Sequence, residues 1–151
     1  MPSSDYRPAI ADIGARMFAR TRDLDGKPHG NFTATTVPSA TAVDALIDDA
    51  LATVEAAVGK DLDGDFLKSA RTCVTFNACM LIELSYFPES TEAGDSAYRA
   101  YEARYEDALK HLKEALTLDR PGDQRVVSLQ MRSSVRGPSG RLDPFANNLI
   151  P

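Results

Sequence analysis

The chain has 151 residues, of which 43% are hydrophobic and 26% charged, and its formal net charge is −5. A chain of this length most often forms one domain around one modest core. No apolar run is long enough to cross a membrane, and the first residues, MPSSDYRPA, lack the basic start and apolar core of a signal peptide, so we expect a cytosolic protein.

The charge is unevenly divided along the chain. Residues 1–119 carry 12 Lys and Arg against 20 Asp and Glu, whereas residues 120–151 carry 5 Arg against 2 Asp. An acidic body repels a DNA phosphate backbone, and the arginines of the tail are accompanied by a single aromatic residue, Phe145. We therefore expect no tight binding of nucleic acid.

A short helix is predicted over residues 8–18, where Pro8 suits the first turn and apolar residues recur at helical spacing, although Gly14 weakens it. The stretch that follows, RTRDLDGKPHGNFTATTVP at residues 20–38, is polar and broken by glycine and proline. None of it is predicted to belong to the core. The DLDG within it is a turn signal, because aspartate and glycine favour tight turns.

An amphipathic helix of about five turns is predicted next, since apolar residues from Val43 to Val58 fall three and four apart. Ser39 is its expected N-cap, and Gly59 its expected end in the left-handed conformation. Asp44, Asp48 and Asp49 lie mostly off the apolar stripe and are expected to face outward.

The helix predicted over residues 65–86 contains CVTFNACMLIEL, which is apolar on nearly every side, so it should be the central helix. Cys73 and Cys79 point away from each other on it and are expected to be buried free thiols. Glu83 is paired with an arginine, lies in water near the helix end, or sits in a subunit contact, because an unpaired buried carboxylate costs several kcal/mol.

The last predicted helix, residues 96–118, sets Tyr98, Tyr101 and Tyr105 on its apolar stripe. Three tyrosines in this arrangement are expected to belong to the core with hydroxyls reaching water; a stacking platform for bases is the alternative.

Beyond Asp119 the predicted secondary structure changes. RPGDQ breaks the helix, and apolar and polar residues alternate loosely in RVVSLQMRSSV, as they do in a strand. A lone strand needs an edge, either in residues 20–36 of its own chain or in another subunit's sheet. The predicted fold is therefore mainly α: a small bundle of three long helices and a short N-terminal helix, with an extended or hairpin-like loop. Residues 1–119 form the helical domain, and residues 120–151 a strand-like tail.

Motifs for catalysis and metal binding are not found. DLDGD at residues 61–65 lacks the later glycine and glutamate of an EF-hand, and Asp63 or Asp65 is instead expected to cap the central helix. His29 and His111 have no ligand at metal-binding spacing. We expect no catalytic residue, metal or cofactor. Interaction with other proteins is the predicted function, and an enzyme with an unmarked site is the alternative from another class.

Three segments resemble a known family. They are ARTRDLDGKPHGNFTATTVPSATAVDALIDDALATVEAAVG, NACMLIELSYFPE and SAYRAYEARYEDALKHLKEAL, and over residues 19–118 they look like the head-to-tail adaptor proteins of long-tailed bacteriophages, especially phages of actinobacteria. The turn-rich segment ending in FT, the Pro-Ser helix start, the ELSYFPE helix end and the tyrosine-rich last helix occur in the family's order. The chain departs from the family at Ala42, where a glutamine or glutamate is frequent, and after residue 119.

The resemblance implies a structural virion protein. Adaptors of this kind are helical-bundle subunits that assemble, usually as twelve copies, into a ring between the portal protein and a stopper or other neck protein. They are found in the host cytoplasm during assembly and in the virion neck afterwards. DNA passes through the ring, and an acidic wall would let it slide. Asp44, Asp48 and Asp49 are candidates for that wall, with an ordinary solvated face as the alternative. A small cytosolic helical assembly factor without a virion role is the second candidate function.

The same resemblance suggests interfaces in the two polar segments. Residues 20–37 are predicted to form an arm that reaches a neighbouring subunit or the next neck protein, with a solvated connecting loop as the alternative. Its contact candidates are Arg22, Asp23, Lys27, His29 and Phe32. The tail is predicted to dock on the portal by strand addition, with arginines meeting an acidic surface. Its candidates are Arg125, Val126, Val127, Leu129, Met131, Arg132, Arg136 and Arg141.

Overall fold

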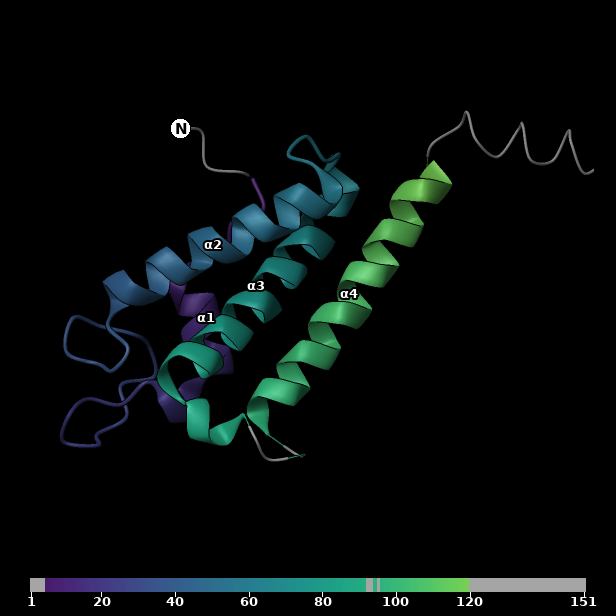
Figure 1. The fold of residues 1–151 in the computed structure, drawn as a ribbon. Helices are drawn as coiled ribbons and strands as arrows, with labels where there is room; N and C mark the ends of the chain where they lie inside the picture. The colour runs from purple at the N-terminus through teal and green to yellow at the C-terminus, as the bar shows by residue number, and fades with distance from the viewer. Residues whose placement is uncertain (1–4, 92–93, 95, 120–151) are drawn as a thin grey trace, which may run out of the picture. The chain divides into compact units, whose positions relative to one another are not determined.

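The computed structural model describes residues 5–91, 94 and 96–119. This part of the chain contains the helices α1 (Ile10–Arg16), α2 (Ala40–Val58), α3 (Gly64–Tyr86) and α4 (Ala97–Asp119), and the short 3-10 turns η1 (Phe18–Arg20) and η2 (Pro88–Ser90) (Figure 1). The contacts reported below lie within the compact unit that ends at Lys113. None of the helices described is long and apolar enough to span a membrane.

The prediction of a mainly helical fold is confirmed for these residues, and the helix ends explain the boundaries. Ser39 caps α2 by accepting a hydrogen bond from the Ala42 N–H at 3.4 Å. Gly59 follows α2 with φ 94° and ψ 168°, so it takes the positive φ expected of it but not the left-handed helical ψ. Asp63 occupies the N-cap position of α3, but its side chain makes no capping hydrogen bond, contrary to the prediction.

The core is built around α3, which packs against both α1 and α2. The centre of the apolar stripe of α2 is buried, with Val43, Ile47 and Val54 shielded from water. Burial on α3 extends over more than one side of the helix, from Ala70 to Glu83. The prediction that this helix is the central one is therefore confirmed.

Both cysteines lie on α3 as buried free thiols, as predicted. Burial disfavours the thiolate, and it raises the pKa of Cys73 to about 11 and that of Cys79 to about 12. Neither sulfur is therefore activated as a nucleophile or metal ligand at neutral pH.

Glu83 is paired with an arginine, which is the first of the three environments predicted for it. Its carboxylate is 1% exposed and is held by Arg20, whose Nε and Nη2 donate to Oε1 and Oε2 at 2.9 Å each. The same guanidinium lies over the Phe87 ring, 4.0 Å from its centroid. Because two parallel hydrogen bonds fix a planar guanidinium, this pair locks the end of α1 and η1 to the end of α3.

The apolar stripe of α4 is only partly covered within the described residues. Leu112 is buried, whereas Tyr98, Tyr101 and Tyr105 are half-buried. The Tyr101 hydroxyl donates to the Arg16 carbonyl at 3.2 Å, and burial is the largest cause that raises the pKa of Tyr101 and Tyr105. The tyrosines thus pack with their rings partly shielded.

Removing the Arg20 side chain should destabilise the fold strongly. We expect Arg20→Ala to lower the free energy of unfolding by about 3 to 5 kcal/mol, because it leaves the buried Glu83 carboxylate without its guanidinium partner. Replacing the exposed Arg22 by alanine is the matched control and should change stability by less than about 0.5 kcal/mol. Urea unfolding of both variants measures the difference. Equal stabilities would show that the ion pair does not hold the fold.

Candidate interaction surface

Residues 20–38 fold back on themselves through a tight turn. The Asp23 N–H donates to the Lys27 carbonyl at 3.1 Å, and the Gly26 N–H donates to the Asp23 carbonyl at 3.0 Å. Gly26 has φ 79°, which a residue with a side chain rarely adopts. The prediction that DLDG forms a turn is therefore confirmed.

The two arms of this loop are joined by a few backbone hydrogen bonds. The His29 N–H donates to the Thr21 carbonyl at 2.8 Å, and the Val37 N–H donates to the Arg22 carbonyl at 3.0 Å. Two isolated antiparallel bridges, Arg22–Pro28 and Asp23–Thr36, are all the pairing that results. The loop is hairpin-like in this limited sense, and no strand forms in it.

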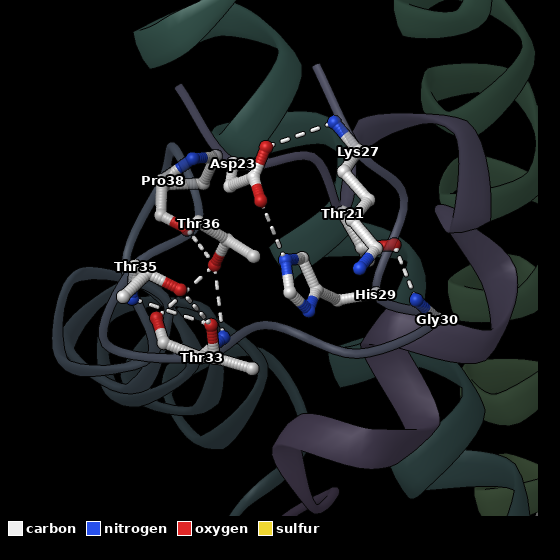
Figure 2. A network of polar contacts seen from close by, with 9 residues as sticks. All are labelled: Thr21, Asp23, Lys27, His29, Gly30, Thr33, Thr35, Thr36 and Pro38. Atoms are coloured by element: carbon white, nitrogen blue, oxygen red, sulfur yellow. Dashed lines mark hydrogen bonds and ion pairs between the residues drawn. The ribbon is translucent and has the colours of Figure 1, made fainter. Parts of the chain in front are cut away.

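Threonine hydroxyls form hydrogen bonds with backbone groups within the loop, as Figure 2 shows. The buried Thr21 hydroxyl accepts from the Gly30 N–H at 3.0 Å. The same hydroxyl donates to the Phe18 carbonyl at 2.8 Å. The buried Thr36 hydroxyl accepts from the Thr33 N–H at 2.8 Å and lies 2.8 Å from the Pro38 carbonyl. These side chains satisfy backbone groups that a short loop cannot pair by itself.

The expectation that residues 20–38 contribute nothing to the core is wrong. Thr21, Phe32 and Thr36 are at most 3% exposed. Phe32 is therefore removed from the contact candidates, because its side chain is already enclosed by its own chain. The physical reason is that the turn returns the chain onto α1, where Gly14 lets the loop approach closely.

An acid and a histidine lie together on the exposed part of the loop. One Asp23 oxygen is 2.9 Å from the His29 Nε2, and the other accepts from the Lys27 N–H at 2.8 Å (Figure 2). The hydrogen bond from His29, followed by the one from Lys27, lowers the pKa of Asp23 below its ordinary value. No three His, Cys, Asp or Glu side chains in the described ranges are placed to hold a metal ion.

A hollow of about 430 Å³ adjoins this loop. It is lined by Ala19, Arg20, Arg22, Asp23, Val37 and Phe87. Val37 is 45% exposed, and Tyr86, next to Phe87 in sequence, is 39% exposed. The hollow thus combines apolar surface with two guanidinium groups and one carboxylate.

The structure brings Arg22 and Asp23 together at this hollow, and Lys27 and His29 are exposed on the adjoining turn. Sequence reasoning missed Val37 and Phe87. The signal that could have found Phe87 is its place in ELSYFPE, where an aromatic residue follows the helix end directly. The tail candidates between Arg125 and Arg141 lie outside the described residues.

The three aspartates predicted to line a channel have different environments. The Arg7 guanidinium donates to Asp44 at 2.7 Å and to Asp48 at 2.8 Å. Asp49 is exposed and forms no ion pair within the described part of the chain. Arg7 was not anticipated from the sequence, because it is far from α2 along the chain. It offsets part of the negative charge on which the channel-wall prediction depends.

No family model matches the chain, and no similar curated protein or solved structure was found for it. The family resemblance therefore depends on the three sequence segments alone.

Adding a methyl group at Gly14 should loosen the loop. A Cβ there would lie 2.8 Å from Asn31 Oδ1 and 3.0 Å from Asn31 Cα, so we expect Gly14→Ala to cost about 1 to 3 kcal/mol. Gly64→Ala is the matched control, because nothing lies within 4 Å of its Cβ, and it should be neutral or slightly stabilising. Thermal unfolding compares them. Faster hydrogen exchange at Gly30 in the first variant alone would locate the effect in the loop.

The Asp23 carboxylate should stabilise the loop only above acidic pH. Because its pKa is lowered on folding, the contribution is complete above the pKa of the unfolded chain, about 3.9, and is lost as pH falls through the lower folded value. The Lys27 amide shift in an NMR titration should report this transition, and Asp23→Asn should abolish it. A midpoint above about 3.9 would contradict the assignment.

Proposed function

We propose that this chain is a head-to-tail adaptor of a long-tailed bacteriophage, which assembles as a ring between the portal and a stopper or other neck protein. The observation that carries the proposal is the ordered set of three segments over residues 19–118, from ARTRDLDG through ELSYFPE to the tyrosine-rich helix. The chain would act as a structural protein in the neck of the virion, and it would need no cofactor.

The contacts of Arg20 support the view that these segments form one motif. Arg20 comes from the first segment, and it binds Glu83 and covers Phe87, which both belong to the second. Tyr101 of the third segment donates to the Arg16 carbonyl, four residues before Arg20. Arg20 thus joins the first two segments physically, although they are distant in sequence.

The hollow beside residues 20–38 supports a role in binding another protein. Its exposed Val37, with Arg22 and Asp23 on the rim, suits the polar-rimmed apolar centre of such contacts. We assign this surface to a neighbouring subunit or to the next neck protein. The basic tail, from Arg125 to Arg141, is assigned to the portal.

The acidic body would serve the passage of DNA. Residues 1–119 carry an excess of carboxylates, and a ring of such bodies would repel phosphates and bind DNA only weakly. Of the candidate wall residues, Asp44 and Asp48 are partly offset by Arg7, and Asp49 retains its full charge.

Electron microscopy of purified portal mixed with the chain tests the proposal directly. We expect additional ring density on the neck side of the portal. A helical chain that binds one soluble partner, leaving the portal bare, would instead support the assembly-factor alternative. Turnover of a substrate that a single surface substitution abolishes would support an enzyme.

Deleting residues 120–151 should separate folding from docking. We expect the shortened chain to keep its helical circular dichroism and thermal transition, because the buried apolar residues of the described part of the chain, from Tyr6 to Leu112, precede the deleted segment, and to lose portal binding. A full-length variant provides the comparison, with glutamine in place of Arg125, Arg132, Arg136 and Arg141. These changes remove four positive charges and should also weaken portal binding. Unfolding of the truncated chain would mean that the tail belongs to the core.

A further inference from the structure

A groove of about 460 Å³ lies between α1 and α3, away from the hollow described above. Its walls carry three cations, Arg16 from α1 and Lys68 and Arg71 from α3, and a single carboxylate, Asp12. The groove is therefore basic, although the chain as a whole is acidic.

The cations of this groove have no carboxylate partner among the described residues. Arg16 lies 4.9 Å from the centroid of the Phe76 ring, and Arg71 donates to the Asp5 carbonyl at 3.0 Å. Lys68 is exposed. The Asp12 carboxylate is engaged by the Ala9 N–H at 3.0 Å, at the start of α1. Three cations beside one carboxylate that is already engaged favour an acidic partner.

The outer face of α2 has the complementary charge. The exposed residues of α2 are small, apart from two adjacent aspartates: Thr41, Ala45, Asp48, Asp49, Ala52, Thr53, Ala56 and Ala57. Small side chains let a second surface approach the helix backbone closely. Asp49 brings to such a contact a carboxylate with no ion pair among the described residues, and Asp48 brings one that also accepts a hydrogen bond from Arg7.

These two surfaces lie on different sides of the subunit. The buried stripe of α2, which includes Val43 and Ile47, faces the helices that it packs against, so its outer face points away from them (Figure 1). The groove is lined by residues of α1 and α3, and none of its lining residues belongs to α2. One copy therefore cannot satisfy its own groove with its own α2.

We propose that the outer face of α2 in one copy docks in the basic groove of the next, with Asp48 and Asp49 facing Arg16, Lys68 and Arg71. Such a contact joins different patches on the two subunits, and a repeated contact of this type closes into a ring when its rotation allows. The inference rests on the proposed function for the expectation that copies assemble. The two surfaces and their charges come from the structure.

The assignment changes the role of the acidic face. An α2 surface seated in a neighbouring groove is not on a channel wall, so the two assignments of Asp48 and Asp49 exclude each other. The contact would also reduce the repulsion between acidic copies, because each junction would bury carboxylates beside cations.

Charge reversal with complementation tests the contact. Sedimentation velocity of the full chain over a concentration series, at low and physiological ionic strength, measures self-association. We expect Lys68→Glu with Arg71→Glu, and separately Asp48→Lys with Asp49→Lys, to weaken association more than about tenfold, because like charges then meet. Mixing the two double variants should restore it, since each reversed groove meets a reversed helix. Circular dichroism verifies that both variants fold.

Matched controls place the same changes in net charge elsewhere. Lys110→Glu with Lys113→Glu, and Glu106→Lys with Glu114→Lys, alter exposed positions on α4 and should leave association within about twofold of the wild-type chain. Equal losses in these controls, or no recovery in the mixture, would overturn the proposed contact. A wild-type chain that stays monomeric throughout the series would do so as well.

The portal experiment separates this inference from the proposed function. If the wild-type chain decorates the portal and the reversed-groove variant forms the same complete rings, the groove contact is wrong and the adaptor role stands. If the groove variant loses portal binding while self-association is unchanged, the occupant of the groove is the portal and not a second copy. If the portal stays bare but complementation succeeds, the adaptor role fails and the contact stands.

Discussion

The structure depends on one buried carboxylate and the guanidinium that neutralises it. Glu83 lies within the core near the end of α3, where a charge without a partner would cost several kcal/mol. Arg20 supplies the partner from the first residues of the polar loop, and its two hydrogen bonds restrict how η1 can lie against α3. The start of the loop is thereby fixed, and the path of the following residues is constrained.

From that anchor, the loop becomes ordered by local polar contacts. Thr21 and Thr36 bury their hydroxyls against backbone groups, and Gly14 leaves room for Asn31 beside α1. A segment rich in glycine, proline and charge therefore behaves as part of the folded body. On its outward side, Val37, Arg22 and Asp23 line one hollow, so the contacts that order the loop also shape this part of the surface.

The distribution of ion pairs leaves regions of different charge on the surface. The Arg7 guanidinium pairs with Asp44 and Asp48 of α2, and the Arg20 guanidinium pairs with Glu83. Arg16, Lys68 and Arg71 keep their charges beside a groove on a chain whose net charge is negative. In an assembly of identical copies, such separated surfaces of opposite sign give neighbouring subunits a preferred orientation, which a uniformly acidic surface would not provide.

The sequence by itself determined the helices, the central place of α3, the burial of both cysteines and the turn at DLDG. These features follow from periodicity and from local backbone preferences, which act between residues close in the chain. Only the tertiary structure decided which arginine neutralises Glu83, that Phe32 is enclosed, and that Arg7 reaches Asp44 and Asp48. Those partners are 37 or more residues apart in the ion pairs, and composition cannot choose among several arginines until packing brings one of them within reach.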